Sequence, residues 1–135
     1  MPDTDAPAEV VLTLPAVPEF VRLARLTCAG LATRIGMGYD EVEDLRIAVG
    51  EACSMLIGDG TRSGSLSLRF VLVPDAVSVE VTGDLTGAPG TDVDTSLSDQ
   101  ILDAVVDEHS ISVSDDRVTL TKRHGSDGVA ETGPA

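Results

Sequence analysis

Residues 39–57, YDEVEDLRIAVGEACSMLI, constrain this chain more than any other stretch, because they have the spacing of one long amphipathic helix. Apolar side chains return every three or four residues and would form a single stripe: Val42, Leu45, Val49, Ala52, Cys53 and Leu56. Asp40 is the predicted N-cap, and Glu43 completes a capping-box pattern three residues later. Gly58 and Gly60 supply the turn chemistry that ends a helix. The sequence therefore predicts a helix over 40–57 with one face in the core.

Glu51 is the unusual residue of this helix, because its neighbours Ala48, Val49, Ala52 and Cys53 are all small and apolar. A carboxylate in such surroundings is costly to desolvate unless it has a partner or a chemical role. Glu51 is therefore the first candidate for a functional side chain.

The composition is that of an acidic globular protein with a core of aliphatic side chains. The chain has 135 residues, with 9 Lys and Arg against 23 Asp and Glu, so one domain is expected and a nucleic-acid-binding face is not. No apolar run approaches the roughly twenty residues that span a bilayer. The start, MPDTDAPAEV, lacks the features of a secretory signal. We therefore expect a soluble, cytoplasmic protein.

The remaining elements follow from alternation, helical spacing and turn signals. Alternating or β-branched runs predict five strands, at 9–14, 65–73, 77–81, 110–113 and 117–121. Helical spacing predicts helices at 18–35, 40–57 and 96–106, and Gly and Asp residues predict a long loop over 83–95. Residues 9–123 would form the domain, between a disordered leader (1–8) and a disordered tail (124–135). Hairpins with grouped helices indicate a two-layer α/β (α+β) sandwich, whose mixed, mostly antiparallel sheet carries three helices on one face.

Several polar or reactive side chains have an ordinary structural interpretation beside a functional one. Cys28 and Cys53 fall inside predicted helices, and we interpret them as buried thiols, not as a disulfide or a metal pair. His109 as a switch or ligand competes with His109 as an ordinary residue at a helix–strand junction, and a lone His is usually the latter. The acidic run 40–44 fits either helix capping or a docking face for a partner.

Two segments of the chain resemble a known family. The string DLRIAVGEACS, from Asp44 to Ser54, and the string ILDAVVDEHSISVSDDRVTLTKR, from Ile101 to Arg123, are similar to the RsbW-like anti-sigma factors and switch serine kinases. These proteins form part of the GHKL (histidine kinase-like) ATPase superfamily, and the resemblance covers about residues 9–123. It implies a Bergerat fold that binds ATP with magnesium, holds a sigma factor and, in many members, phosphorylates a serine on an antagonist with a STAS domain.

The sequence departs from this family at the metal site. The family places a Glu and an Asn one helical turn apart, where the Glu acts as base and the Asn oxygen holds magnesium. Glu51 is present, but Met55 occupies the Asn position. Magnesium prefers oxygen ligands, so a thioether is a poor substitute. Glu51 as catalytic base therefore competes with Glu51 as a relic or a helix-surface residue.

The adenine-binding box, D-x-G-x-G in the family, is also incomplete. Gly83 stands where the aspartate is expected, and Asp84 follows one place late. Leu85 replaces the first glycine, while Gly87 fits the second. The resemblance therefore implies a degenerate nucleotide site made of Glu51, Met55, Asp84 and Gly87, in which Asp84 competes with an ordinary turn residue.

The segment that would cover the phosphates has lost its glycines. The family has G-x-G-[LI] before its third helix, and this chain has TSLS at 95–98. Glycines let backbone N–H groups approach a phosphate, so their absence weakens anion binding. Asp84, Asp92 and Asp94 add negative charge to the same loop. We therefore expect the loop to repel a triphosphate.

These observations favour an anti-sigma-factor-like regulator that binds and sequesters a sigma factor, with weak or lost ATP binding and no resident cofactor. The alternative is an ATP- and magnesium-dependent protein-serine kinase that phosphorylates an anti-sigma-factor antagonist. A third interpretation is a small-molecule sensor with a pocket under the 83–95 loop. In all three, the expected partners are proteins or small ligands, not nucleic acid or membrane, and a homodimer is possible by the resemblance.

Overall fold

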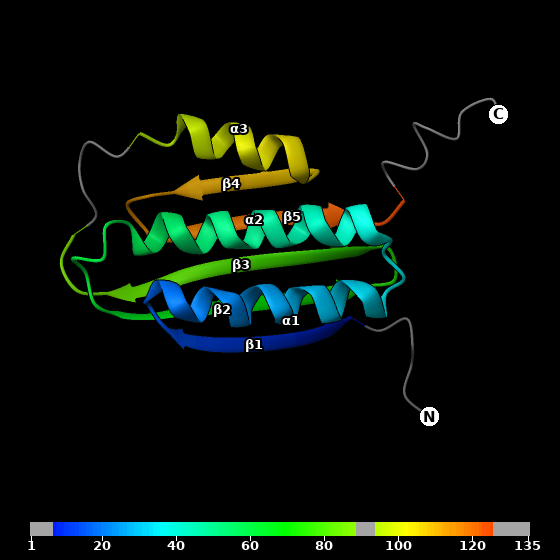
Figure 1. Ribbon diagram of the computed structural model, residues 1–135, viewed down its shortest axis with the longest axis horizontal. Coiled ribbons are helices and arrows are strands. Elements are labelled where there is room, and N and C mark those ends of the chain that lie inside the picture. The colour runs from blue at the N-terminus through cyan, green and yellow to red at the C-terminus, as the bar shows by residue number, and fades with distance from the viewer. Residues whose placement is uncertain (1–6, 89–93, 126–135) are drawn as a thin grey trace.

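The computed structural model describes residues 7–88 and 94–125, which form a sheet of five strands and a layer of helices (Figure 1). The predicted leader and tail fall largely outside the described residues, and so does Asp92. The elements in chain order are β1 (Ala8–Pro15), η1 (Pro18–Phe20), α1 (Val21–Arg34), α2 (Tyr39–Ile57), β2 (Gly64–Val73), β3 (Ala76–Leu85), α3 (Ser96–Val105), β4 (Glu108–Ser112) and β5 (Arg117–Arg123).

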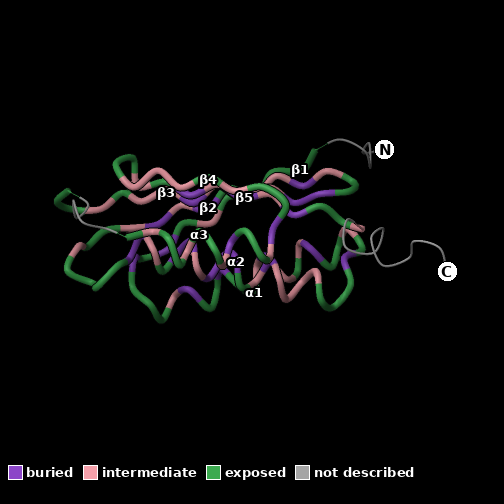
Figure 2. The backbone as a smooth tube through the Cα atoms, turned by 90° about the horizontal axis from the view of Figure 1, so that it is seen from above, coloured by how far each residue is buried: buried purple, intermediate pink, exposed green. Residues whose placement is uncertain are grey.

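The strands lie in the order β1-β2-β3-β5-β4, and every pairing among the described residues is antiparallel. All three helices cover the same face of the sheet, so the molecule has two layers (Figures 1 and 2). Helix α1 packs over β2, α2 over β3 and β5, and α3 beside β4. The predicted two-layer α/β sandwich is confirmed.

Strand alternation decides which face is buried. On β2 the residues Leu66, Leu68, Phe70 and Leu72 are buried, while the intervening residues, such as Arg69, face solvent or are half-buried. From α2 the buried side chains include most of the predicted stripe: Leu45, Val49, Ala52, Cys53 and Leu56, with Val42 partly buried against the same core. The opposite face of the sheet is polar. The core therefore lies between the sheet and α2, as the spacing predicts.

Helix α2 begins at a different cap from the one predicted. Gly38 is the N-cap, and Glu41 accepts a hydrogen bond from the Gly38 backbone N–H at 3.0 Å from Oε1. Glu43 instead pairs with Arg46, at 2.7 Å from Nη1. The prediction of an Asp40/Glu43 box is wrong because Gly38, with its extended backbone, caps the helix two residues before Asp40, so that Glu41 and not Glu43 occupies the third helical position.

Glu41 also ties the end of β5 to the start of α2. Its Oε2 accepts the Gly125 backbone N–H at 2.6 Å, and His124 Nδ1 lies 2.9 Å from Oε1. Burial alone would raise the pKa of Glu41, but the hydrogen bonds from Gly125, Gly38 and His124 outweigh it and lower the pKa below 4.5. The carboxylate therefore stabilises the folded state in its charged form.

This linkage predicts a pH dependence. Because the folded pKa lies below the unfolded value, the stabilisation by Glu41 is present above about pH 4.5 and disappears as the pH falls through the folded pKa. We expect Glu41→Gln to lower the free energy of unfolding by about 1 kcal/mol at pH 7, and by less below pH 4. Urea unfolding of both proteins at pH 3 to 7 measures this, and a difference that grows toward low pH would contradict it.

The sheet is longer than the sequence predicts at β3. That strand continues to Leu85, where Gly64 of β2 is its partner, so Gly83 and Asp84 belong to the sheet and not to a loop. The pairing with β2 overrides the turn preference of glycine and aspartate. No helix among the described residues is both long enough and apolar enough to cross a membrane.

Candidate functional site

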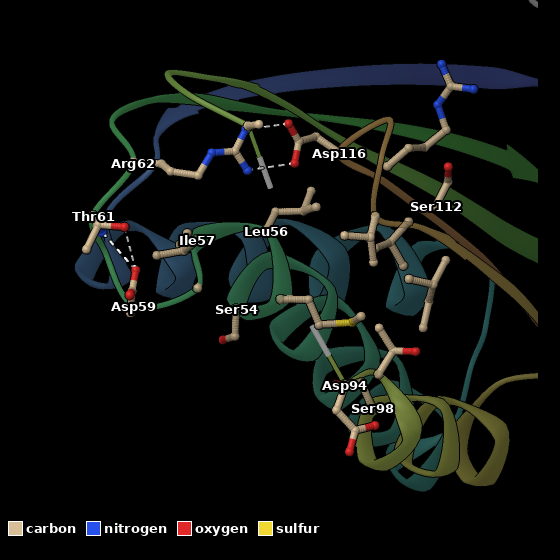
Figure 3. A pocket seen from close by; sticks show the side chains of 18 residues that line it. Ser54, Leu56, Ile57, Asp59, Thr61, Arg62, Asp94, Ser98, Ser112 and Asp116 are labelled. Carbon is tan, nitrogen blue, oxygen red and sulfur yellow. Dashed lines mark hydrogen bonds and ion pairs between the residues drawn. The ribbon is translucent and has the colours of Figure 1, made fainter. Parts of the chain in front are cut away.

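A cavity of about 530 Å³ lies where the C-terminal half of α2 meets the start of α3 and the turn between β4 and β5 (Figure 3). Its apolar lining comes from α2, β4, the turn and β5: Met55, Leu56, Ile57, Ile111, Val113 and Val118. Charged residues of the lining stand on the loops and strand ends: Asp59, Arg62, Asp94, Asp116 and Arg117. The volume is that of a small-molecule site, so this cavity is the candidate functional site.

Glu51, the candidate base, is held by a side chain of α3. Its Oε2 accepts a hydrogen bond from Ser98 Oγ at 2.6 Å, which joins the middle of α2 to the first turn of α3. Ser98 lines the cavity, and Glu51 does not. The costly carboxylate identified from the sequence thus has a partner, and that partner lies in the segment that has lost its glycines.

Met55 lines the cavity one helical turn after Glu51. A thioether sulfur is a soft ligand, and magnesium requires hard oxygen ligands in near-octahedral geometry. Within residues 7–88 and 94–125, no group of three His, Cys, Asp or Glu side chains is arranged to hold a metal ion. The residues at this position therefore do not fit a magnesium ion that bridges phosphates.

The remaining predicted site residues lie at one end of β3. Asp84 is exposed, and by strand alternation it shares the outer face of the sheet with Glu80 and Thr82, whereas the cavity lies on the helix side. Gly83 faces the helices, and its backbone N–H donates to Asp116 O at 2.8 Å. Gly87 follows the strand with φ of 72°. Asp84 is thus not among the residues that line the cavity.

An ion pair that sequence analysis did not identify holds the loops at this end of the cavity together. Arg62 and Asp116 form a two-pronged pair, with Nη1–Oδ1 2.9 Å and Nη2–Oδ2 2.7 Å (Figure 3). Arg62 also donates to Thr86 O at 2.9 Å and to Gly87 O at 3.0 Å. The hydrogen bonds to Asp116 raise the pKa of Arg62. Most of its N–H donors are therefore committed to protein acceptors.

Two further carboxylates of the lining stay charged. Hydrogen bonds from the Thr61 hydroxyl and backbone lower the pKa of Asp59, and those from Ser96 lower the pKa of Asp94. The other cation of the lining, Arg117, has its Nε 3.4 Å from Glu80 Oε2. A cavity whose cations are paired and whose carboxylates are charged opposes a triphosphate.

The cysteines and His109 have the ordinary roles that the sequence favours. Cys28 and Cys53 are buried free thiols, and burial raises the pKa of each to about 12, so neither is a nucleophile at neutral pH. His109 Nε2 lies 3.0 Å from Asp99 Oδ1, where it joins β4 to α3.

Comparison with known proteins gives this geometry a context. The serine-protein kinases RsbW of Bacillus subtilis strain 168 and of Halalkalibacterium halodurans are each 40% identical to the chain, over 78 and 77 residues. The chain is similar to the RsbW serine-protein kinases. The aligned segments cover 56% of this chain and 49% or 48% of the relatives, so the RsbW-like chain spans about half the length of the curated relatives it matches.

A solved structure supports the fold of the RsbW-like chain independently. The crystal structure of the RsbU and RsbW domains of Rv1364c from Mycobacterium tuberculosis superposes with a TM-score of 0.64 over 87% of this chain and 32% of that one. The identity is 20%, so this likeness concerns the fold alone. No protein-family model matches the chain. The resemblance to RsbW-like proteins is confirmed by the sequence relatives.

Proposed function

We propose that this protein is an anti-sigma-factor-like regulator that binds and sequesters a sigma factor, with weak or lost ATP binding. Two features of α2 carry this proposal. Met55 lines the cavity, and Glu51, one helical turn before it, is hydrogen-bonded to Ser98. The resemblance to RsbW supports the proposed binding function, and Met55 at the expected position of the metal ligand supports the proposed loss of catalysis. The mechanism would be occlusion of the sigma-factor surface that contacts the polymerase or DNA.

Phosphoryl transfer depends on positioning and on neutralisation of charge by metal ions. This chain offers Met55 in place of an oxygen ligand, and Asp84 lies on the far side of the sheet from the cavity. Arg62 is held by Asp116 and two carbonyls, which leaves little of its donor capacity for a phosphate. We therefore assign no catalytic step to ATP or magnesium here.

The alternative function is a protein-serine kinase that phosphorylates an anti-sigma-factor antagonist with a STAS domain. The names of the relatives favour it, because they are serine-protein kinases at 40% identity over the matched segment. Under either function we propose a cytoplasmic protein whose partners are proteins, with homodimerisation open to measurement by light scattering.

The net charge of the chain predicts how its association with a partner depends on salt. The chain has a formal net charge of −14, so it should attract a basic surface of a sigma factor and associate by electrostatic steering. We expect the association rate with a cognate sigma factor to fall about tenfold or more between 50 mM and 500 mM salt, while dissociation changes less. Stopped-flow or surface-plasmon measurement checks this, with in vitro transcription as the assay of sequestration.

Two outcomes would contradict the proposal. An association rate that is constant across this salt range would remove the electrostatic mechanism. Failure of the protein to inhibit transcription by any sigma factor of its source organism would remove sequestration itself.

A further inference from the structure

The floor of the cavity between α2, α3 and the β4–β5 turn is apolar and belongs to the core of the protein. Leu56, Ile57 and Val118 line the cavity and are at most 7% exposed. Met55 and Ile111 line it as well and are partly buried against the same core. A cavity of about 530 Å³ with such a floor fits a small ligand that has an apolar body, because the burial of apolar surface favours its binding.

One wall of this cavity is fixed by contacts within the protein. Arg62 and Asp116 both line the cavity and bind each other through two pairs of atoms (Figure 3). Arg62 also donates to the carbonyl oxygens of Thr86 and Gly87, and the Ser63 backbone N–H donates to Thr86 Oγ1 at 3.0 Å. The contacts set the position of this wall, so a ligand would pay little to order it.

The charges left over at the rim of the cavity are negative. Asp59 stands on the loop after α2, and Asp94 stands on the segment before α3 (Figure 3). Neither carboxylate forms an ion pair with any residue of the described ranges 7–88 and 94–125. Hydrogen bonds from Thr61 and from Ser96 lower the pKa of the two carboxyl groups, so both are charged at neutral pH. The rim therefore attracts a cation and repels an anion.

We propose that this cavity binds a small amphipathic cation, a molecule with an apolar body and one protonated amine. The apolar body would pack on Met55 and Ile111, and the ammonium group would lie at the rim, where Asp59 and Asp94 attract it. An anionic head group is disfavoured, because Arg62 is committed to protein acceptors. This site goes beyond the sequestration proposed above and does not depend on it.

The test uses three probes with the same phenylbutyl body: 4-phenylbutylamine, 4-phenylbutanol and 4-phenylbutyrate. Each is titrated into the full chain at pH 7 and constant ionic strength, and the ¹³C-methyl signals of the methionines are followed by NMR. Met55 lines the cavity, and Met37, which is buried but does not line it, is the internal control. The Met55 signal should shift saturably with the amine, with a dissociation constant on the order of a millimolar.

The head group sets the expected order of affinity. The butyrate should bind at least about fivefold more weakly than the amine, and the alcohol should lie between them, because the carboxylates at the rim are exposed and their effect is modest. Asp59→Asn together with Asp94→Asn should make the three affinities equal. The matched control is Asp75→Asn together with Asp103→Asn, which removes two exposed carboxylates outside the cavity and should keep the order.

A second pair of variants tests the place of the apolar body. Val113→Trp should fill the cavity and abolish the saturable shift with all three probes, because Val113 is a half-buried residue of the lining. Leu26→Trp, on the exposed face of α1, should leave the shift unchanged. If Val113→Trp fails to fold, the two Asn substitutions decide, since both replace exposed side chains.

Four results would overturn the proposal. The first is the absence of a saturable Met55 shift with the amine up to about 20 mM. The second is binding of the alcohol or the butyrate as tight as that of the amine. The third is a preference for the amine that survives the Asp59→Asn and Asp94→Asn substitutions. The fourth is a Met55 shift undiminished by a folded Val113→Trp protein, because the probe would then bind elsewhere.

Discussion

Gly64→Ala should destabilise the protein by more than about 4 kcal/mol and leave little folded material at 37 °C. Gly64 begins β2 with φ of 143°, a conformation that L-residues with side chains rarely adopt. An added Cβ would lie 2.0 Å from Asp84 O and 3.1 Å from Leu85 Cα, both of them backbone atoms of β3. Neither atom can give way without separation of the β2–β3 pair, so the clash must disrupt the sheet beside the cavity.

Gly30→Ala is the matched control for this substitution. Gly30 lies inside α1 with open space around its Cβ position, so alanine should stabilise the helix by roughly 0.5–1 kcal/mol. Thermal unfolding of both variants measures the contrast. A Gly64→Ala protein that unfolds within a few degrees of the unaltered chain would mean that the β2–β3 register is different.

Leu45→Ala should lower the free energy of unfolding by about 2–5 kcal/mol. Leu45 is 0% exposed and lies in the first half of α2, where it belongs to the core between the helices and the sheet. Its truncation removes apolar contact and leaves a cavity that close-packed neighbours cannot fill. The substitution keeps a good helix former, so the effect reports packing and not helix propensity.

Leu97→Ala provides the comparison, because Leu97 of α3 is 67% exposed. We expect a change within about 0.5 kcal/mol there. Urea denaturation gives both values. A loss below about 1 kcal/mol for Leu45→Ala would show that α2 presents a different face to the core.

The parts of the fold that sequence predicts are those governed by local periodicity. The stripe of α2 and the alternation of β2 each bury one face, and the structure places both faces in the core. The ends of strands are harder to predict from sequence. Strand β3 extends to Leu85 because it pairs there with Gly64, which lies more than twenty residues away in the chain. The predicted start of α2 is wrong for a local reason. Asp40, Glu41 and Glu43 can all accept hydrogen bonds at a helix N-terminus, and only the backbone conformation of Gly38 decides which of them does so.

In the candidate site, too, sequence predicts the local spacing but not the long-range contacts. Helical spacing alone places Glu51 and Met55 one turn apart, but it could not supply Ser98, which approaches from α3. The pair of Arg62 and Asp116 joins residues 54 positions apart in two loops, and no periodic signal marks either one. Buried Lys122, with its Nζ 3.2 Å from Asp44 Oδ2, likewise depends on how β5 meets α2. Long-range polar contacts of this kind become visible only when the layers are assembled.

The measurement that tests the central claim most directly is calorimetric titration of the protein with ATP and magnesium, run beside Met55→Asn. The claim predicts no saturable binding below about 1 mM for the unaltered chain, because Met55 cannot hold the metal and the charged Asp59 and Asp94 oppose the phosphates. Met55→Asn alone should not restore phosphate transfer, since Asp84 still faces away from the cavity. Micromolar binding by the unaltered protein, or phosphorylation of a cognate antagonist that Glu51→Ala abolishes, would contradict the account and establish the kinase.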